Sequence, residues 1–114
     1  MKKFIFMFLL VFVSGIANAV KIDELNGMWL IESYQEINGG KEINADGTDF
    51  WEFNNSEYNA YSSGFKFTET KFILSNDTVT VKKDSGDQVI KIESFAGGTM
   101  RVNDGKYFYN LRKQ

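Results

Sequence analysis

The sequence predicts an all-β protein whose strands form a small antiparallel up-and-down barrel. Turn signals made of glycine with asparagine, aspartate or serine recur through the chain after residue 38. Between them lie short segments that are rich in β-branched and aromatic residues, and several alternate apolar with polar positions. Short alternating segments with frequent turns are typical of a β-sandwich or β-barrel. No segment shows a convincing helical period, apart from one possible turn at 23–25.

Residues 1–19 have the pattern of a secretory signal peptide. A short basic start precedes a continuous apolar run over 4–13, and the Ala-Asn-Ala of 17–19 is a small-x-small cleavage pattern. A membrane-spanning helix requires ~20 apolar residues, so the run suits a signal better than an uncleaved anchor. We therefore expect a periplasmic or secreted domain over 20–114.

The chain contains no cysteine and no histidine. Without cysteine, disulfides and a lipid-anchored N-terminus are excluded, so we expect no membrane anchor after signal cleavage. Without histidine, the commonest catalytic base and the commonest transition-metal ligand are missing. Glutamates within the expected strands suit alternating surface positions without an acid pair. The sequence therefore predicts no enzyme, no cofactor and no metal site.

The charge of the expected mature domain is acidic. Removing the first 19 residues takes away two lysines and leaves 11 basic against 15 acidic residues, a net charge of −4. No basic stripe is visible, which argues against nucleic acid as a partner. The segment 44–49 faintly resembles a calcium loop, but the glutamate that should end such a loop is replaced by Asn55. We interpret it as a turn with solvated acids.

Eight strands are expected. They cover residues 28–37, 50–54, 57–61, 65–75, 78–83, 88–95, 99–103 and 106–113. Their links are short, and Asp104-Gly105 is a strong two-residue hairpin signal, so successive strands should pair antiparallel. Closing the resulting meander into a barrel removes both exposed edges.

One strand changes parity along its length. In 65–75, Phe65 and Phe67 share one face, whereas Phe72 and Leu74 share the other. One extra residue reverses every later side chain, so we expect a bulge near Thr70.

The stretch ELNGMW at 24–29 resembles the first-strand signature of lipocalin-like proteins, in which Leu25-x-Gly27-x-Trp29 leads into the first strand. The resemblance implies that Gly27 permits close backbone approach and that Trp29 plugs the closed end of the barrel. It also implies that a basic residue of the last strand, here Arg112, packs over the indole. The chain looks like the compact lipocalin-like domains of bacterial exported proteins.

The aromatic residues supply the candidate ligand site. An aromatic inner face with tyrosine hydroxyls is the usual composition of a pocket for a small apolar ligand. The candidate ligand-binding residues are Trp51, Phe53, Tyr58, Phe65, Phe67, Tyr107 and Tyr109. A packed core explains the same rings and is their more frequent use. Ser33, Ser62 and Thr68 are candidate polar positions inside the barrel.

The sequence is compatible with two functions. The first is an exported lipocalin-like binding protein that holds a small apolar ligand in the barrel. The second is a protein-interaction module, such as a periplasmic immunity protein or an enzyme inhibitor, acting through its loops. The long connection over 39–49 is the candidate contact loop. A cavity of a few hundred cubic ångströms would favour the first function, and a filled interior the second.

Overall fold

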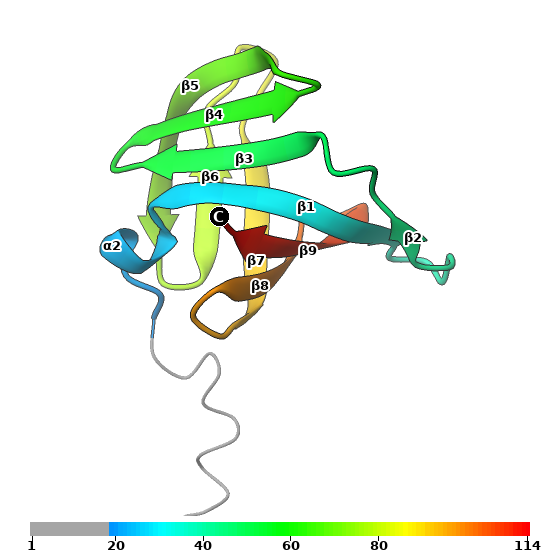
Figure 1. The fold of residues 1–114 in the computed structure, drawn as a ribbon. Coiled ribbons are helices and arrows are strands. Elements are labelled where there is room, and N and C mark those ends of the chain that lie inside the picture. Colours follow the sequence, from blue (N-terminus) through cyan, green and yellow to red (C-terminus); the bar gives the residue numbers. More distant parts are fainter. Residues whose placement is uncertain (1–18) are drawn as a thin grey trace, which may run out of the picture.

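The computed structural model describes residues 19–114, and 1–18 of the predicted signal peptide lie outside it. The elements are α2 (Ile22–Leu25), β1 (Gly27–Glu36), β2 (Ile43–Asn44), β3 (Asp49–Asn54), β4 (Glu57–Ser62), β5 (Phe65–Ser75), β6 (Thr78–Val81), β7 (Gln88–Phe95), β8 (Thr99–Asn103) and β9 (Tyr107–Lys113) (Figure 1). No helix within 19–114 is long and apolar enough to cross a membrane.

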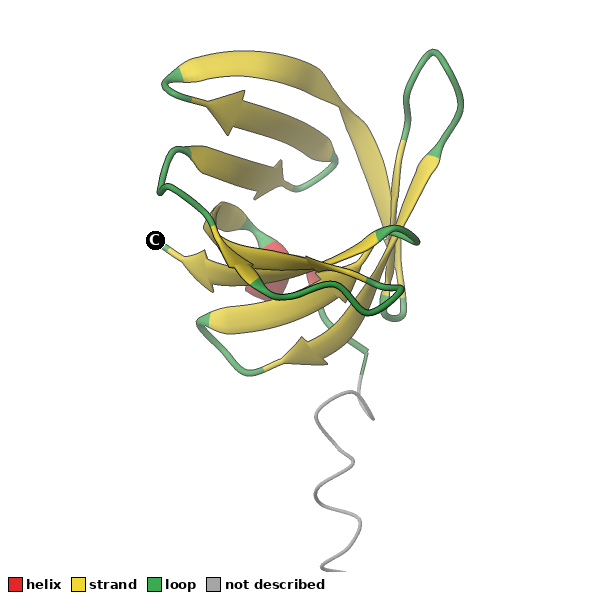
Figure 2. Cartoon of the chain, turned by 90° about the vertical axis from the view of Figure 1, so that its right-hand side faces the viewer, coloured by secondary structure: helices red, strands yellow, loops and turns green. Residues whose placement is uncertain are grey.

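The strands form a closed antiparallel barrel. Each strand from β3 to β9 pairs with the next, and β1 pairs with β3 on one side and with β9 on the other. Strand β9 runs beside β1 from Glu36↔Tyr107 to Trp29↔Lys113. Figure 2 shows the strands curling around one interior. The predicted all-β, eight-stranded up-and-down barrel is therefore confirmed.

The ninth strand, β2, was not predicted. It pairs only with Ser33 and Tyr34 of β1, on the edge that β3 leaves uncovered. Its two residues lie in a polar stretch with no alternating pattern, so the sequence contained no strand signal there. Strand β2 thus fixes part of the expected 39–49 loop against the barrel wall.

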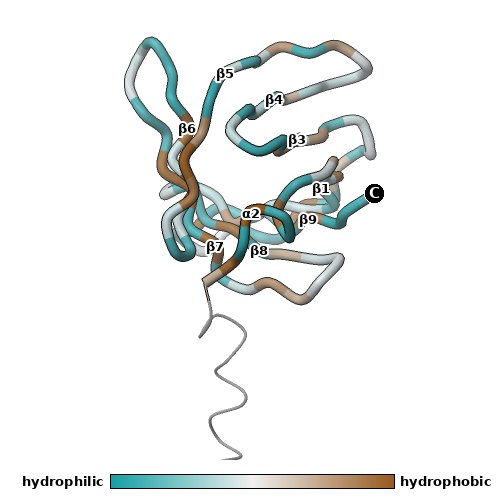
Figure 3. The backbone as a smooth tube through the Cα atoms, turned by 90° about the vertical axis from the view of Figure 1, so that its left-hand side faces the viewer, coloured by the Kyte–Doolittle hydropathy of each residue, from teal (hydrophilic) through white to brown (hydrophobic). Residues whose placement is uncertain are grey.

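The core fills the barrel from its closed end. Buried apolar side chains come from all eight barrel strands, and Val79, Val81, Ile90 and Ile92 form the wall contributed by β6 and β7. Figure 3 shows this apolar concentration in β6, β7 and α2, with hydrophilic turns between the strands. The alternating burial of β6 and β8 is what a strand with one wet side requires.

The expected bulge near Thr70 lies elsewhere. The pairing of β4 with β5 runs regularly from Glu57↔Lys71 to Ala60↔Thr68, and then shifts so that Tyr61 faces Lys66. Phe67 is therefore the extra residue. Thr70 stays in register, and its Oγ1 donates to the carbonyl of Lys82 at 2.5 Å. The parity change was predicted correctly, but its position was wrong by three residues.

Trp29 closes one end of the barrel. Its side chain is fully buried, its Nε1 donates to the Leu25 carbonyl at 2.8 Å, and its ring centroid lies 5.8 Å from that of Phe95. The hydrogen bond joins the indole to α2, which covers the same end. Trp29 therefore occupies the plug position that the resemblance implied.

Lys113, and not Arg112, is the cation over the indole. Lys113 Nζ lies 5.4 Å from the Trp29 ring centroid and donates to the Glu24 carbonyl at 2.8 Å. A Cβ on Gly27, whose φ is +134°, would stand 3.0 Å from Lys113 Cε, so this glycine makes room for the lysine stem. Arg112 points outward and pairs with Glu32 at 2.7 Å. The expected Arg112 stacking was wrong because residue 112 is out of phase with the inward-facing Leu111.

This arrangement makes a paired prediction. Lys113→Met retains the apolar stem and removes the charge, so the free energy of unfolding should fall by about 1 kcal/mol, the scale of one cation–π contact. Arg112→Met removes only an exposed ion pair and should cost less. Urea denaturation of both variants beside the wild type measures the difference. A larger loss for Arg112→Met would show that Arg112, and not Lys113, stabilises the closed end through the Trp29 ring.

Candidate functional site

A cavity of about 420 Å³ opens at the end of the barrel opposite Trp29. Its lining residues come from β1, β3, β4, β5 and β9, and they are Ile31, Tyr34, Asp49, Trp51, Tyr61, Ser62, Phe67, Tyr107 and Tyr109. The volume lies in the range of small-molecule sites, and the walls are mainly aromatic with a few polar groups. This open-end cavity is the candidate ligand site.

The predicted ligand-binding residues divide into three groups. Trp51, Phe67, Tyr107 and Tyr109 line the cavity. Phe53 and Tyr58 are 2% and 4% exposed and pack with each other below it, so they belong to the core.

Phe65 lies in neither the cavity nor the core. Its side chain is 76% exposed, which contradicts the expectation that it faces the barrel interior. The register shift at Phe67 puts Phe65 opposite Ser62, but Phe65 is the first residue of β5, directly after the turn at 63–64, so its ring stands at the mouth of the barrel, where it is exposed. Phe67 itself is 66% exposed and reaches only the rim of the cavity.

Tyr34 and Asp49 were missed by sequence reasoning. Trp29 and Ile31 point inward, so simple alternation would place Tyr34 outside. The pairing of β1 with β9 shifts between Ile31 and Ser33, which turns Tyr34 inward opposite Tyr109. Asp49 opens β3 two residues before the inward Trp51, and this spacing was the signal that could have identified it.

The three serine and threonine candidates also separate. Ser62 lines the cavity, opposite Asp49 in the pairing of β3 with β4. Ser33 is buried on the outer side of β1, where its Oγ donates to Glu42 Oε2 at 2.6 Å. Thr68 borders a shallow hollow between β5 and the segment after β6.

Four of the six aromatic rings that line the cavity pack against one another. The centroids of Tyr34, Tyr107 and Tyr109 lie 5.9–6.4 Å apart, and those of Trp51 and Tyr109 lie 5.2 Å apart. Tyr34 meets Tyr107 at 81°, and Trp51 meets Tyr109 at 64°. The Tyr34–Tyr109 and Tyr107–Tyr109 pairs are tilted at 40° and 47°, so none of the four pairs is a flat stack. We call these four residues the aromatic box.

The environment of the cavity keeps Tyr109 protonated. Burial, followed by the negative charge of Asp104 and smaller contributions from Tyr107, Tyr34 and Asp49, raises the pKa of Tyr109 to about 12. Deeper in the core, burial and then Tyr109 raise the pKa of Tyr58 well above its ordinary value of 10. Both hydroxyls therefore stay protonated near pH 10, where a solvated tyrosine ionises.

These shifts predict alkaline destabilisation. The unfolded tyrosines lose their protons near pH 10, whereas folded Tyr58 and Tyr109 retain theirs, so the folded state binds more protons and stability falls as pH rises. The contribution is fully present below about pH 10 and is lost through pH 12 and above. We expect the Tm to drop more steeply over pH 9.5–11.5 in the wild type than in Tyr109→Phe. Parallel curves would contradict the assignment.

The loop at 39–49 is held against the barrel beside the cavity. Glu42 Oε2 also accepts from Asn110 Nδ2 at 3.1 Å, and the Ala45 amide donates to the Glu32 carbonyl at 2.9 Å. Together with β2 these contacts restrict the loop. A second hollow of about 450 Å³ lies between this loop and the aromatic box, and it shares Tyr34 and Tyr107 with the open-end cavity.

A larger hollow of about 750 Å³ lies between the turn after β6 and the turn before β9. Its walls are turn residues and charged side chains, among them Lys83, Asp87 and Asp104. Small-molecule sites are concave, mostly apolar and built around a few convergent polar groups. The open-end cavity fits that description better despite its smaller volume.

Comparison with known proteins supports the fold. No protein-family model matches the chain, and a search of curated proteins finds no match. Two solved structures are similar. One is an uncharacterized protein from Bacteroides eggerthii DSM 20697, with 20% identity and a TM-score of 0.66 over 79% of this chain and 99% of that one. The other is a lipocalin-like protein from Bacteroides uniformis ATCC 8492, with 16% identity and a TM-score of 0.66 over 80% of this chain and 99% of that one. The chain therefore has the lipocalin-like barrel fold.

Proposed function

We propose that this protein is an exported binding protein that holds a small, largely apolar ligand in the open-end cavity. The observation that supports the proposal best is the aromatic box at one end of a barrel whose other end is filled by Trp29. An eight-stranded barrel has room for one small ligand when its side chains leave the interior partly empty, as in lipocalins. Export follows from the signal-peptide pattern of 1–19.

The proposal is tested with N-phenyl-1-naphthylamine, a neutral apolar probe whose fluorescence rises in an apolar site. We expect saturable binding to the mature domain. Ser62→Trp places a large side chain in the cavity and should lower the affinity for the probe by about tenfold or more. Ser56→Trp, the same substitution in the exposed turn between β3 and β4, is the control and should bind like the wild type. Equal binding by both variants would place the probe outside the cavity.

A second function, contact with a protein partner, is favoured by the apolar side chains outside the cavity. Phe65 is 76% exposed, and Ile43 of β2 is 49% exposed. Native mass spectrometry of the protein from the exported fraction of its host separates the two functions. Retention of a small molecule that Ser62→Trp does not retain supports the carrier. A stoichiometric protein complex that Phe65→Ser abolishes supports the interaction module.

A further inference from the structure

The aromatic box is joined by one carboxylate. Among the lining residues of the open-end cavity, all within the described range, Asp49 is the one acidic residue, and none is basic. It stands at the start of β3, two residues from Trp51 and opposite Ser62. None of the ion pairs found within 19–114 involves Asp49. The cavity therefore combines electron-rich rings with a negative charge that has no cationic partner.

The charge of Asp49 acts inside the cavity. Together with Asp104, and after the effect of burial, it contributes to the raised pKa of Tyr109 in the box. Basic side chains lie outside. Lys106 Nζ stands 5.9 Å from the Tyr107 centroid, and Lys41 lines the adjoining hollow together with Glu36. A ligand that enters the cavity therefore meets one carboxylate among its lining residues, with the nearby lysines outside that lining.

Three classes of ligand can be compared at this site. An anion would be repelled by Asp49, and a neutral apolar molecule would remove water from the carboxylate without replacing it. An organic cation with small alkyl groups would pair with Asp49 and place its charge against the rings. Each cation–ring contact is attractive and strengthens as water is excluded, and boxes of this composition recognise quaternary ammonium groups.

We propose that the open-end cavity selects organic ammonium cations that carry small apolar substituents. The aromatic box formed by Tyr34, Trp51, Tyr107 and Tyr109 would surround the cation, and Asp49 would balance its charge. This inference rests on the proposed function, because it names the ligand class of the same cavity.

The test uses a pair of ligands that differ in one atom. Choline and its neutral isostere 3,3-dimethylbutan-1-ol have the same shape, with nitrogen replaced by carbon. Isothermal titration of the mature domain at low salt should show choline binding about tenfold more tightly than the alcohol. Asp49→Asn preserves the size of the side chain and should remove most of this preference.

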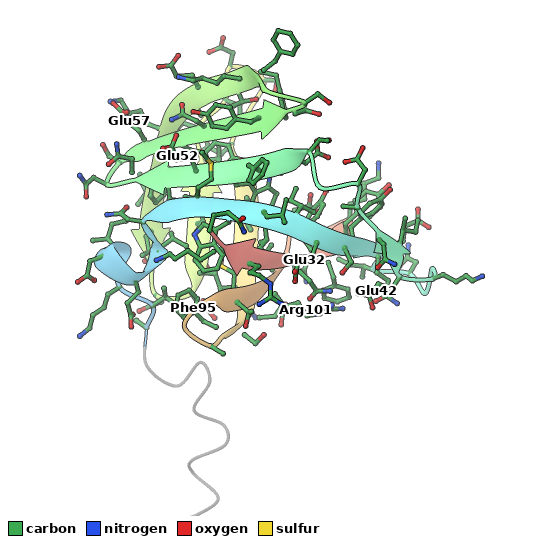
Figure 4. All side chains as sticks on the ribbon, in the orientation of Figure 1. Glu32, Glu42, Glu52, Glu57, Phe95 and Arg101 are labelled. Atoms are coloured by element: carbon green, nitrogen blue, oxygen red, sulfur yellow. The ribbon has the colours of Figure 1, made fainter. Side chains whose placement is uncertain are left out.

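A matched control removes the same charge at the other end of the barrel. Glu57 begins β4, whereas Ser62 of the cavity ends it, and Figure 4 shows Glu57 at the β3–β4 turn on the side of α2. Glu57→Gln should retain the preference for choline. An equal loss in Asp49→Asn and Glu57→Gln would show an effect of net charge and overturn the inference.

The outcomes separate this inference from the proposed function. If choline and the alcohol bind equally, or if neither binds while N-phenyl-1-naphthylamine does, the inference is wrong and the apolar carrier stands. If none of the three probes binds, both proposals are wrong. A choline preference that also disappears in Ser62→Trp, and not in Ser56→Trp, places the cation in the cavity.

Discussion

Trp29→Ala is expected to lower the free energy of unfolding by about 3–5 kcal/mol, which is the usual cost of removing a buried tryptophan side chain. The indole is fully buried and touches three elements. It donates to Leu25 of α2, packs against Phe95 of β7 and lies under Lys113 of β9. Alanine would leave a cavity at the closed end and remove each of these contacts.

Urea denaturation followed by far-ultraviolet circular dichroism measures the loss. Trp29→Phe is the matched control, because it retains a ring and removes only the Nε1 donor and part of the volume. We expect the free energy of unfolding of Trp29→Phe to lie between those of the wild type and Trp29→Ala. If Trp29→Ala instead melts like the wild type, the closed end does not depend on the indole.

The strands were predictable because their signals are local. Alternation and turn residues decide which face of a short strand is buried, and those features are readable one segment at a time. The start and end of 65–75, 88–95 and 99–103 agree with β5, β7 and β8 as observed. Barrel closure was a consequence of strand number and short links, both of which the sequence contains.

The site was harder to predict because it depends on pairing between strands. Tyr34 enters the cavity only because of the register shift after Ile31, and no residue type in that stretch marks the shift. A second shift, at Phe67, puts Phe65 opposite the cavity-lining Ser62, yet Phe65 is exposed because it stands at the mouth of the barrel, directly after the 63–64 turn. The shift in β1 reverses the parity of the residues beyond it, so an alternation count assigns Tyr34 to the wrong face, and the end of the barrel wall at Phe65 depends on how far its neighbours extend.

The contact of Lys113 with the Trp29 indole, in contrast, was readable from local alternation. Tyr107, Tyr109 and Leu111 share the inward face of the last strand, and continuing that alternation leads to Lys113. The local pattern therefore contained the correct residue. The resemblance to lipocalin-like proteins directed attention to an arginine, and the neighbouring lysine performs the role here.

Phe53→Ala is expected to cost about 3–5 kcal/mol in unfolding free energy while the folded protein still binds N-phenyl-1-naphthylamine. Phe53 was a candidate ligand-binding residue, but it is 2% exposed and does not line the cavity. Its ring centroid lies 5.0 Å from that of Phe72 and 5.4 Å from that of Tyr58. It therefore supports the floor beneath the aromatic box.

The measurement pairs urea denaturation with probe titration under conditions where Phe53→Ala remains folded. Phe53→Leu is the control, since it retains most of the apolar volume and should cost less. Trp51→Ala is the contrast, because Trp51 forms a wall of the cavity and its loss should weaken probe binding as well as stability. If Phe53→Ala abolished binding in the folded protein, ligand would reach below the box, and the boundary between site and core would lie deeper in the barrel than Trp51.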